Sequence, residues 1–342
     1  MSVYWNRAVW IVALLLALAP QAVLAQSVED WLRGTGMSEK EMSGLDAGEP
    51  VVRVPNSDDP DEVTLLAVVR VDASPETIRQ LARDVSGLAA RNDQVLEVGV
   101  YSAEPERQDA AALHLPEGDV KDLRKCRVGD CAVRLTEPAI DTLQATVDWS
   151  SPDPAVQVND YMATWLTAYL LDYQRTGAEA LAVYADKEER DAVAEGLDAL
   201  LRKTELAIDY DPDFHRYVAS FPQEESPGVE NLYYWTLEDL SLKPTLFLNH
   251  MAIRGGDDSD VLVIVKQIYA SHYIQAGVTV YAALSVADED PSSGVYVFLT
   301  QRLRFDGKVG GIKRKALEEG TKKAAREQLE AFRQLAEAMP SR

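Results

Sequence analysis

The chain has 342 residues, of which 46% are hydrophobic, and it carries 56 acidic against 34 basic side chains. A chain of this length and apolar content can bury a large core, in one elaborated domain or two small ones. The formal net charge of −22 repels nucleic acid and anionic lipid surfaces at long range, so we expect no nucleic-acid partner.

Residues 1–25 have the order of charged, apolar and small residues that is typical of a secretory signal peptide. Arg7, the only charge in this segment, precedes an apolar run over 8–19, and small residues at 23–25 fit a cleavage site. The run of 12 residues is shorter than the roughly 20 needed to span a bilayer, which favours cleavage over a transmembrane anchor. We expect a mature protein that begins near Gln26, carries 33 basic against 56 acidic residues (net charge −23) and is periplasmic or secreted.

Two segments precede the middle of the chain. Residues 26–60 read as an N-terminal arm, and residues 61–154 read as the first part of the folded core. Within that core, the apolar and β-branched run over 63–71 predicts a strand. Ser74-Pro75 follows, with a capping hydroxyl and a proline suited to the first helical turn. The pattern therefore predicts a strand that leads directly into a capped helix, and Val95 to Tyr101 predicts a further strand.

The only cysteines, Cys126 and Cys131, lie close together in this part of the chain. In an oxidising compartment such a pair favours a structural disulfide, which here would fix a turn at Gly129-Asp130. A redox motif usually has two residues between its cysteines, whereas this pair has four. A zinc site would need further ligands that the sequence does not offer. We expect neither a metal nor a cofactor.

The second half of the chain changes from helical to strand-like patterning. Residues 155–222 begin with a broad apolar stripe at helical spacing and predict a helical insertion. Residues 223–342 predict an antiparallel sheet followed by a C-terminal helix. Short turns separate four strand-like runs: Thr245 to Ile253, Val261 to Ala270, Ala276 to Val286 and Val295 to Phe305. The final helix, from Ile312 to about Met339, is expected to turn small residues toward the sheet: Ala316, Ala324 and Ala336.

This order of elements resembles the START-like, or helix-grip, proteins of the polyketide cyclase and lipid-transfer type. The resemblance rests on Val68-Val69-Arg70-Val71-Asp72-Ala73-Ser74-Pro75-Glu76 and on residues 261–339. It implies an α+β fold in which an antiparallel sheet grips a long C-terminal helix around an apolar cavity, with the helical stretch as an insertion. The segment from Lys266 to Tyr273 and the cysteine pair also resemble uncharacterised exported bacterial proteins.

Polar side chains scattered along the predicted strands are candidates for orienting an amphipathic ligand against an apolar wall. The candidate ligand-binding residues are His250, Gln267, Tyr269, His272, Tyr281 and Arg302. A solid core whose polar strand ends reach water explains the same alternation equally well. No nucleophile can be placed beside either histidine, so we assign no catalytic residue.

These patterns favour an exported binding protein for a lipid or other hydrophobic small molecule, without chemistry. One alternative is a cavity-based enzyme of the cyclase or hydrolase type that uses Tyr269, His272, His250 or Arg302. The other is an envelope protein-interaction module whose helical region docks a partner protein.

Overall fold

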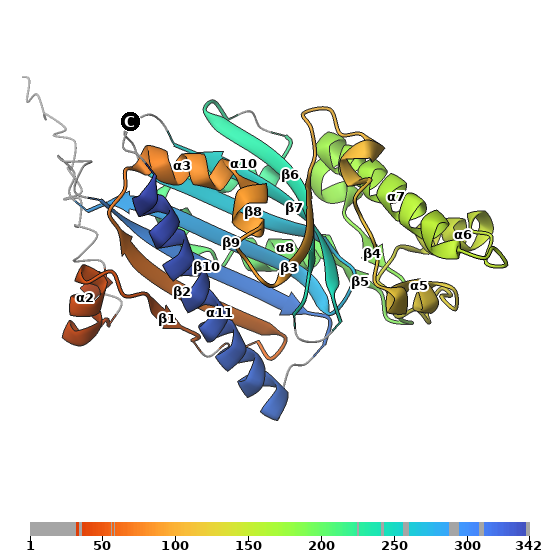
Figure 1. Ribbon diagram of the computed structural model, residues 1–342, viewed down its shortest axis with the longest axis horizontal. Coiled ribbons are helices and arrows are strands. Elements are labelled where there is room, and N and C mark those ends of the chain that lie inside the picture. Colours follow the sequence, from red (N-terminus) through yellow and green to blue (C-terminus); the bar gives the residue numbers. More distant parts are fainter. Residues whose placement is uncertain are drawn as a thin grey trace, which may run out of the picture.

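A computed structural model of the protein describes residues 32–33, 36–55, 57, 59–223, 226–240, 243–255, 260–286, 294–307 and 311–339 (Figure 1). The predicted signal peptide lies outside these residues.

One antiparallel sheet of eight strands organises the described residues, with the strand order β1-β2-β10-β9-β8-β7-β6-β3. Its strands are β1 (Val51–Arg53), β2 (Glu62–Val71), β3 (Val95–Val100), β6 (Val229–Glu238), β7 (Thr245–Arg254), β8 (Val261–Ala270), β9 (Ile274–Ser285) and β10 (Val295–Phe305). Strands β6 to β10 form a meander, because each pairs with the next in the chain. Strand β2 comes from much earlier in the sequence and pairs with β10 along its whole length, for example Val71 with Val295.

Helices flank both faces of the sheet. They are α2 (Glu39–Asp46), α3 (Pro75–Arg83), α4 (Val85–Ala89), α5 (Glu117–Leu123), α6 (Glu137–Thr146), α7 (Pro154–Thr176), α8 (Val193–Leu201), α9 (Glu205–Tyr210), α10 (Pro212–Ser220) and α11 (Gly311–Ala338). Two 3₁₀ turns, Arg107–Ala110 and Gly177–Ala180, and a small ribbon of β4 (Val183–Tyr184) with β5 (Asp191–Ala192) complete the chain.

The sheet separates two hydrophobic cores, because side chains alternate between its faces. Figure 1 shows α11 crossing the face that also carries α3, while α8 lies behind the sheet. On β10, Val295, Val297 and Leu299 belong to the core under α11, whereas Tyr296 and Phe298 belong to the larger core under the other helices. The predicted fold class, α+β with an antiparallel sheet and a long C-terminal helix, is confirmed.

The predicted strand-to-helix connection is also confirmed at β2 and α3. The Ser74 hydroxyl accepts a hydrogen bond from the backbone N–H of Thr77 at 3.2 Å, and Pro75 occupies the first turn. The helix then buries Ile78 and Leu81 against the sheet. Local capping chemistry therefore fixes where the chain leaves the sheet.

The predicted contact stripe of α11 is partly wrong. Ala336 is buried as expected, but Ala324 is only partly buried, and its neighbour Ala325 points to the sheet instead. The spacing from Ala325 to Leu329 and on to Ala336 sets the phase of the helix, which turns Ala324 away. The side chain of Ala316 lies outside the description.

The cysteine pair closes the predicted turn. A disulfide joins Cys126 to Cys131. Gly129 adopts a positive φ of 83°, which favours glycine, and the N–H of Asp130 donates to the carbonyl of Arg127 at 2.9 Å. Among the described residues, no helix is both long and apolar enough to cross a membrane.

Candidate functional site

A cavity of about 280 Å³ lies between the sheet and α11, with α3 and α4 at its side. Most of its lining is aliphatic or aromatic: Ile78, Val85, Met251, Val263, Val297, Leu299, Leu329 and Phe332. These residues come from both layers, so the space is a gap in the packing of α11 on the sheet. The sequence patterns fitted a cavity and a solid core equally well. The structure has a cavity at this place.

Tyr281 marks the floor of this cavity. Every residue of β9 from Ala276 to Leu284 is buried except Tyr281, which is 38% exposed. Strand β9 lies inside the sheet, between β8 and β10, so no sheet edge explains this exposure. The tyrosine is exposed because α11 leaves open space above it.

Strand β6 contributes three polar residues to the same cavity. Tyr234, Thr236 and Glu238 alternate along the strand and therefore point to one face. The Thr236 hydroxyl donates to Glu238 Oε1 at 2.7 Å. Within the described part of the chain, Glu238 pairs with no basic side chain, and the hydroxyls of Tyr234 and Tyr281 have no hydrogen-bond partner. The lining of the apolar cavity thus includes the polar side chains of Tyr234, Thr236, Glu238 and Tyr281.

The electrostatics of this group disfavour negative charge. Burial raises the pKa of the Glu238 carboxyl, and the Thr236 hydrogen bond only partly offsets the rise. The poor solvation of its hydroxyl in the apolar cavity, together with the nearby Glu238, raises the pKa of Tyr281 to about 12. The pKa of Tyr234 is also raised, by burial first and then by Tyr281 and Glu238. A ligand that brings a positive charge or a hydrogen-bond donor would stabilise the ionised Glu238 carboxylate.

Of the six candidate residues from the sequence, only Tyr281 lines the cavity. His250 lies on the opposite face of the sheet and is fully buried. Its Nδ1 accepts from the Tyr173 hydroxyl and its Nε2 donates to Asn231 Oδ1, both at 2.8 Å. Burial, and secondarily the charge of Lys266, lowers its pKa well below the usual value. His250 is therefore a neutral histidine in a satisfied buried network.

A β-bulge explains why Tyr269 lies away from the cavity. The register between β7 and β8 shifts, so that Leu248 faces Tyr269 while the next residue, Asn249, faces Gln267. Strict alternation predicts Gln267 and Tyr269 on one face, and the extra residue, Ile268, breaks that alternation. Gln267 is partly buried and packs beside Gly277, outside the cavity lining.

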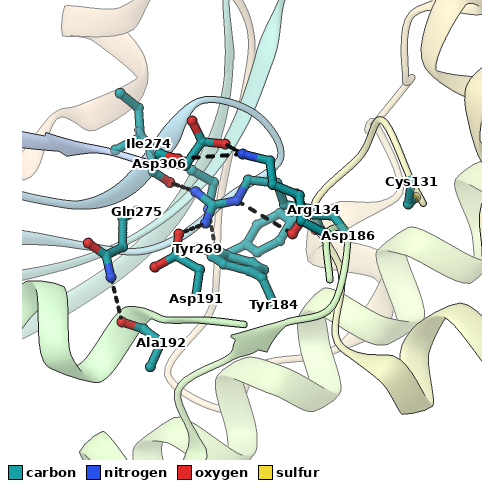
Figure 2. Close-up of polar contacts among 12 residues, drawn as sticks. Cys131, Arg134, Tyr184, Asp186, Asp191, Ala192, Tyr269, Ile274, Gln275 and Asp306 are labelled. Carbon is teal, nitrogen blue, oxygen red and sulfur yellow. Dashed lines mark hydrogen bonds and ion pairs between the residues drawn. The ribbon is translucent and has the colours of Figure 1, made fainter. Parts of the chain in front are cut away.

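Tyr269 instead contacts a buried ion cluster on the other face (Figure 2). Its hydroxyl donates to the backbone carbonyl of Arg134 at 3.0 Å. The Arg134 guanidinium lies 3.9 Å from the ring centre of Tyr184 and binds the Ile274 carbonyl and the Asp191 carboxylate. Because Arg134 is only 2% exposed, this cluster joins the sheet to the β4–β5 ribbon as a structural element.

His272 and Arg302 are likewise bound by other protein groups. His272 Nε2 donates to Asp119 Oδ2 at 2.9 Å, with both side chains buried. Arg302 Nη1 donates to Thr64 Oγ1 at 3.0 Å and lies 3.2 Å from Glu62 Oε1. Both residues lie outside the cavity lining.

Sequence reasoning missed the polar residues of the cavity because it missed β6. The segment Val229–Glu238 combines Glu, Asn, Tyr, Trp and Thr, so its apolar residues show no clean alternation. The available signal was the polar series Tyr234, Thr236 and Glu238 at a spacing of two.

Comparison with solved structures finds similarity to a STAR-related lipid transfer protein fragment from Xanthomonas axonopodis. The two chains are 9% identical, and the match covers 84% of this chain and 93% of that one, with a TM-score of 0.37. That protein is of the START-like type that the sequence resembles. No protein-family model matches the sequence, and no curated protein does.

Proposed function

We propose that this protein binds a lipid or another hydrophobic small molecule in the cavity between the sheet and α11. The observation that carries the proposal is the exposure of Tyr281 beneath α11, in an otherwise buried stretch of a central strand. An apolar lining with a few converging polar groups is the usual composition of a small-molecule site. The volume of about 280 Å³ is close to the lower end of the typical range, which favours a ligand with a single hydrocarbon chain.

The enzyme alternative finds no support in this geometry. Its four candidate residues, Tyr269, His272, His250 and Arg302, are engaged by other protein groups and lie outside the cavity lining.

Filling the cavity from α11 is expected to abolish binding. Ala331 lines the cavity and is exposed, so a tryptophan at this position can enter the open space without displacing packed atoms. We expect Ala331→Trp to lower the affinity for a single-chain amphiphile at least about tenfold and to change the free energy of unfolding by less than about 1 kcal/mol. Calorimetric titration of dodecanol and chemical denaturation measure the two quantities.

Ala338→Trp is the matched control, since Ala338 is an exposed alanine of the same helix outside the cavity lining. This variant should bind as the wild type does. Equal affinity of both variants, or a wild type that binds no single-chain amphiphile, would contradict the proposed function.

We also propose that the protein is exported and acts in the periplasm or outside the cell. The proposal is supported by the sequence of residues 1–25 and agrees with a disulfide between the two cysteines. Intact mass analysis of the protein from its host should place the N-terminus at or near Gln26. Recovery of the chain with Met1 still attached would refute this prediction.

A further inference from the structure

We infer that the cavity selects amphiphiles whose polar end is a hydrogen-bond donor, above all a protonated amine, and that Glu238 receives this group. The inference rests on the proposed function, because it specifies the ligand of the same cavity.

The cavity wall offers a set of hydrogen-bond acceptors. Glu238 Oε1 accepts from Thr236, and no hydrogen bond among the described residues occupies Oε2. The phenol oxygens of Tyr234 and Tyr281 are also without partners there, and each can accept a hydrogen bond. An ammonium group offers three donors and no acceptor, which matches this set of oxygen atoms.

The distribution of charge around the cavity favours a cationic ligand over an anionic one. The titratable groups in its lining are Glu238, Tyr234 and Tyr281, together with Arg91. Arg91 is exposed, and its Nη1 donates to the carbonyl of Gly87 at 2.7 Å, so its charge faces water beside α4. The lining residues from α3, β7, β8, β10 and α11 carry no titratable side chain. When Glu238 is ionised, it has no counter-ion among the described residues, and a ligand carboxylate would add a second negative charge beside it.

Binding of an amine is linked to the protonation of Glu238. Burial raises the pKa of Glu238 in the free protein, and an ammonium group beside it would lower that pKa again. Binding of an amine then releases a proton, so the affinity increases as pH rises through the raised pKa. The ligand itself stays protonated, because the pKa of an alkyl amine is close to that of lysine, about 10.4.

Three ligands with the same chain and different polar ends test the inference. Dodecylamine, dodecanol and dodecanoate are titrated into the purified protein by calorimetry, below the concentrations at which they aggregate. We expect dodecylamine to bind at least about tenfold more tightly than dodecanoate, the size of one charge-assisted hydrogen bond. Glu238→Gln should lower dodecylamine affinity about tenfold, change dodecanol affinity less than about threefold, and remove the rise of amine affinity as pH increases above the ordinary carboxyl pKa of 4.5.

Glu230→Gln is the matched control. It removes one negative charge from the same strand, but Glu230 pairs with Arg83 outside the cavity lining. If the two variants weaken dodecylamine binding equally, the preference for the amine over dodecanoate reflects net charge, and the inference is wrong. If wild type binds all three ligands equally, the inference fails and the proposed function stands. If none of the ligands binds, the proposed function itself fails.

Discussion

Replacing Arg134 with alanine is expected to lower the free energy of unfolding by about 3–5 kcal/mol. The guanidinium binds the Ile274 carbonyl and Asp191, lies 4.0 Å from Asp186 and packs over the Tyr184 ring (Figure 2). Removing it would leave a buried carbonyl and two carboxylates without their cation. Burial already raises the pKa values of Asp186 and Asp191, and only Arg134 and smaller effects oppose that rise.

Arg190→Ala provides the control for this prediction. Arg190 comes from the same ribbon and pairs with Glu137 at 2.8 Å, but its side chain is 40% exposed. Exposed pairs contribute about 0–1 kcal/mol, so this variant should unfold close to the wild type in urea. Similar losses of unfolding free energy in both variants would show that Arg134 does not join the ribbon to the sheet.

Replacing Lys266 with methionine is expected to stabilise the protein by ~2–4 kcal/mol at about pH 6. Lys266 is 4% exposed, and its ammonium group donates to the Val218 carbonyl at 2.7 Å. The rings of Tyr173 and Phe221 lie 5.3 and 5.5 Å away, and no carboxylate among the described residues pairs with it. Burial therefore lowers its pKa from 10.5 to about 7. Methionine keeps the volume and removes the buried charge.

The pH dependence of this gain gives the sharper test. A lysine with a depressed pKa binds its proton more weakly in the folded state than in the unfolded state. The free-energy cost of burying the charged Lys266 is fully present below about pH 7 and disappears as pH rises toward 10.5. The difference between Lys266→Met and wild type should therefore shrink from about pH 7 to pH 10 in urea denaturation series. A pH-independent difference, or a loss of stability at about pH 6, would contradict the prediction.

Lys243→Met is the matched control, because Lys243 is 41% exposed and pairs with Asp122 at 2.6 Å. The hydrogen bond and charge of Asp122 raise its pKa, the opposite direction to Lys266. This substitution should give no gain in the free energy of unfolding at about pH 6.

The parts of the fold that depend on local patterns could be predicted from the sequence. The strand before Ser74, the helix after it and the disulfide turn each depend on neighbouring residues, through capping, β-branched runs or cysteine spacing. The long helix α11 was equally clear from its period; of its predicted sheet-facing alanines, Ala336 is buried, whereas Ala325 takes the place expected for Ala324.

The site was mostly not predictable because it depends on contacts between distant segments. Tyr281 could be placed on a strand, but its exposure depends on where α11 passes over the sheet. A single bulge moved Tyr269 to the opposite face, and no local signal marks that bulge. Polar residues such as His250 and His272 suggested a site from their chemistry, yet partners far away in the sequence engage them: Tyr173, Asn231 and Asp119.

The pairing of β2 with β10 has a consequence for the order of folding. Its partners Val71 and Val295 are 224 positions apart, so this pairing must close a very long loop before the sheet is complete. The meander from β6 to β10 needs only contacts between neighbouring strands and can form earlier. During synthesis from the N-terminus, β2 emerges together with β1 but long before β10, so the edge of β2 that faces β10 stays unpaired until almost the whole chain is available. A chain stopped before β10 would therefore lack the strand that joins β1 and β2 to the rest of the sheet.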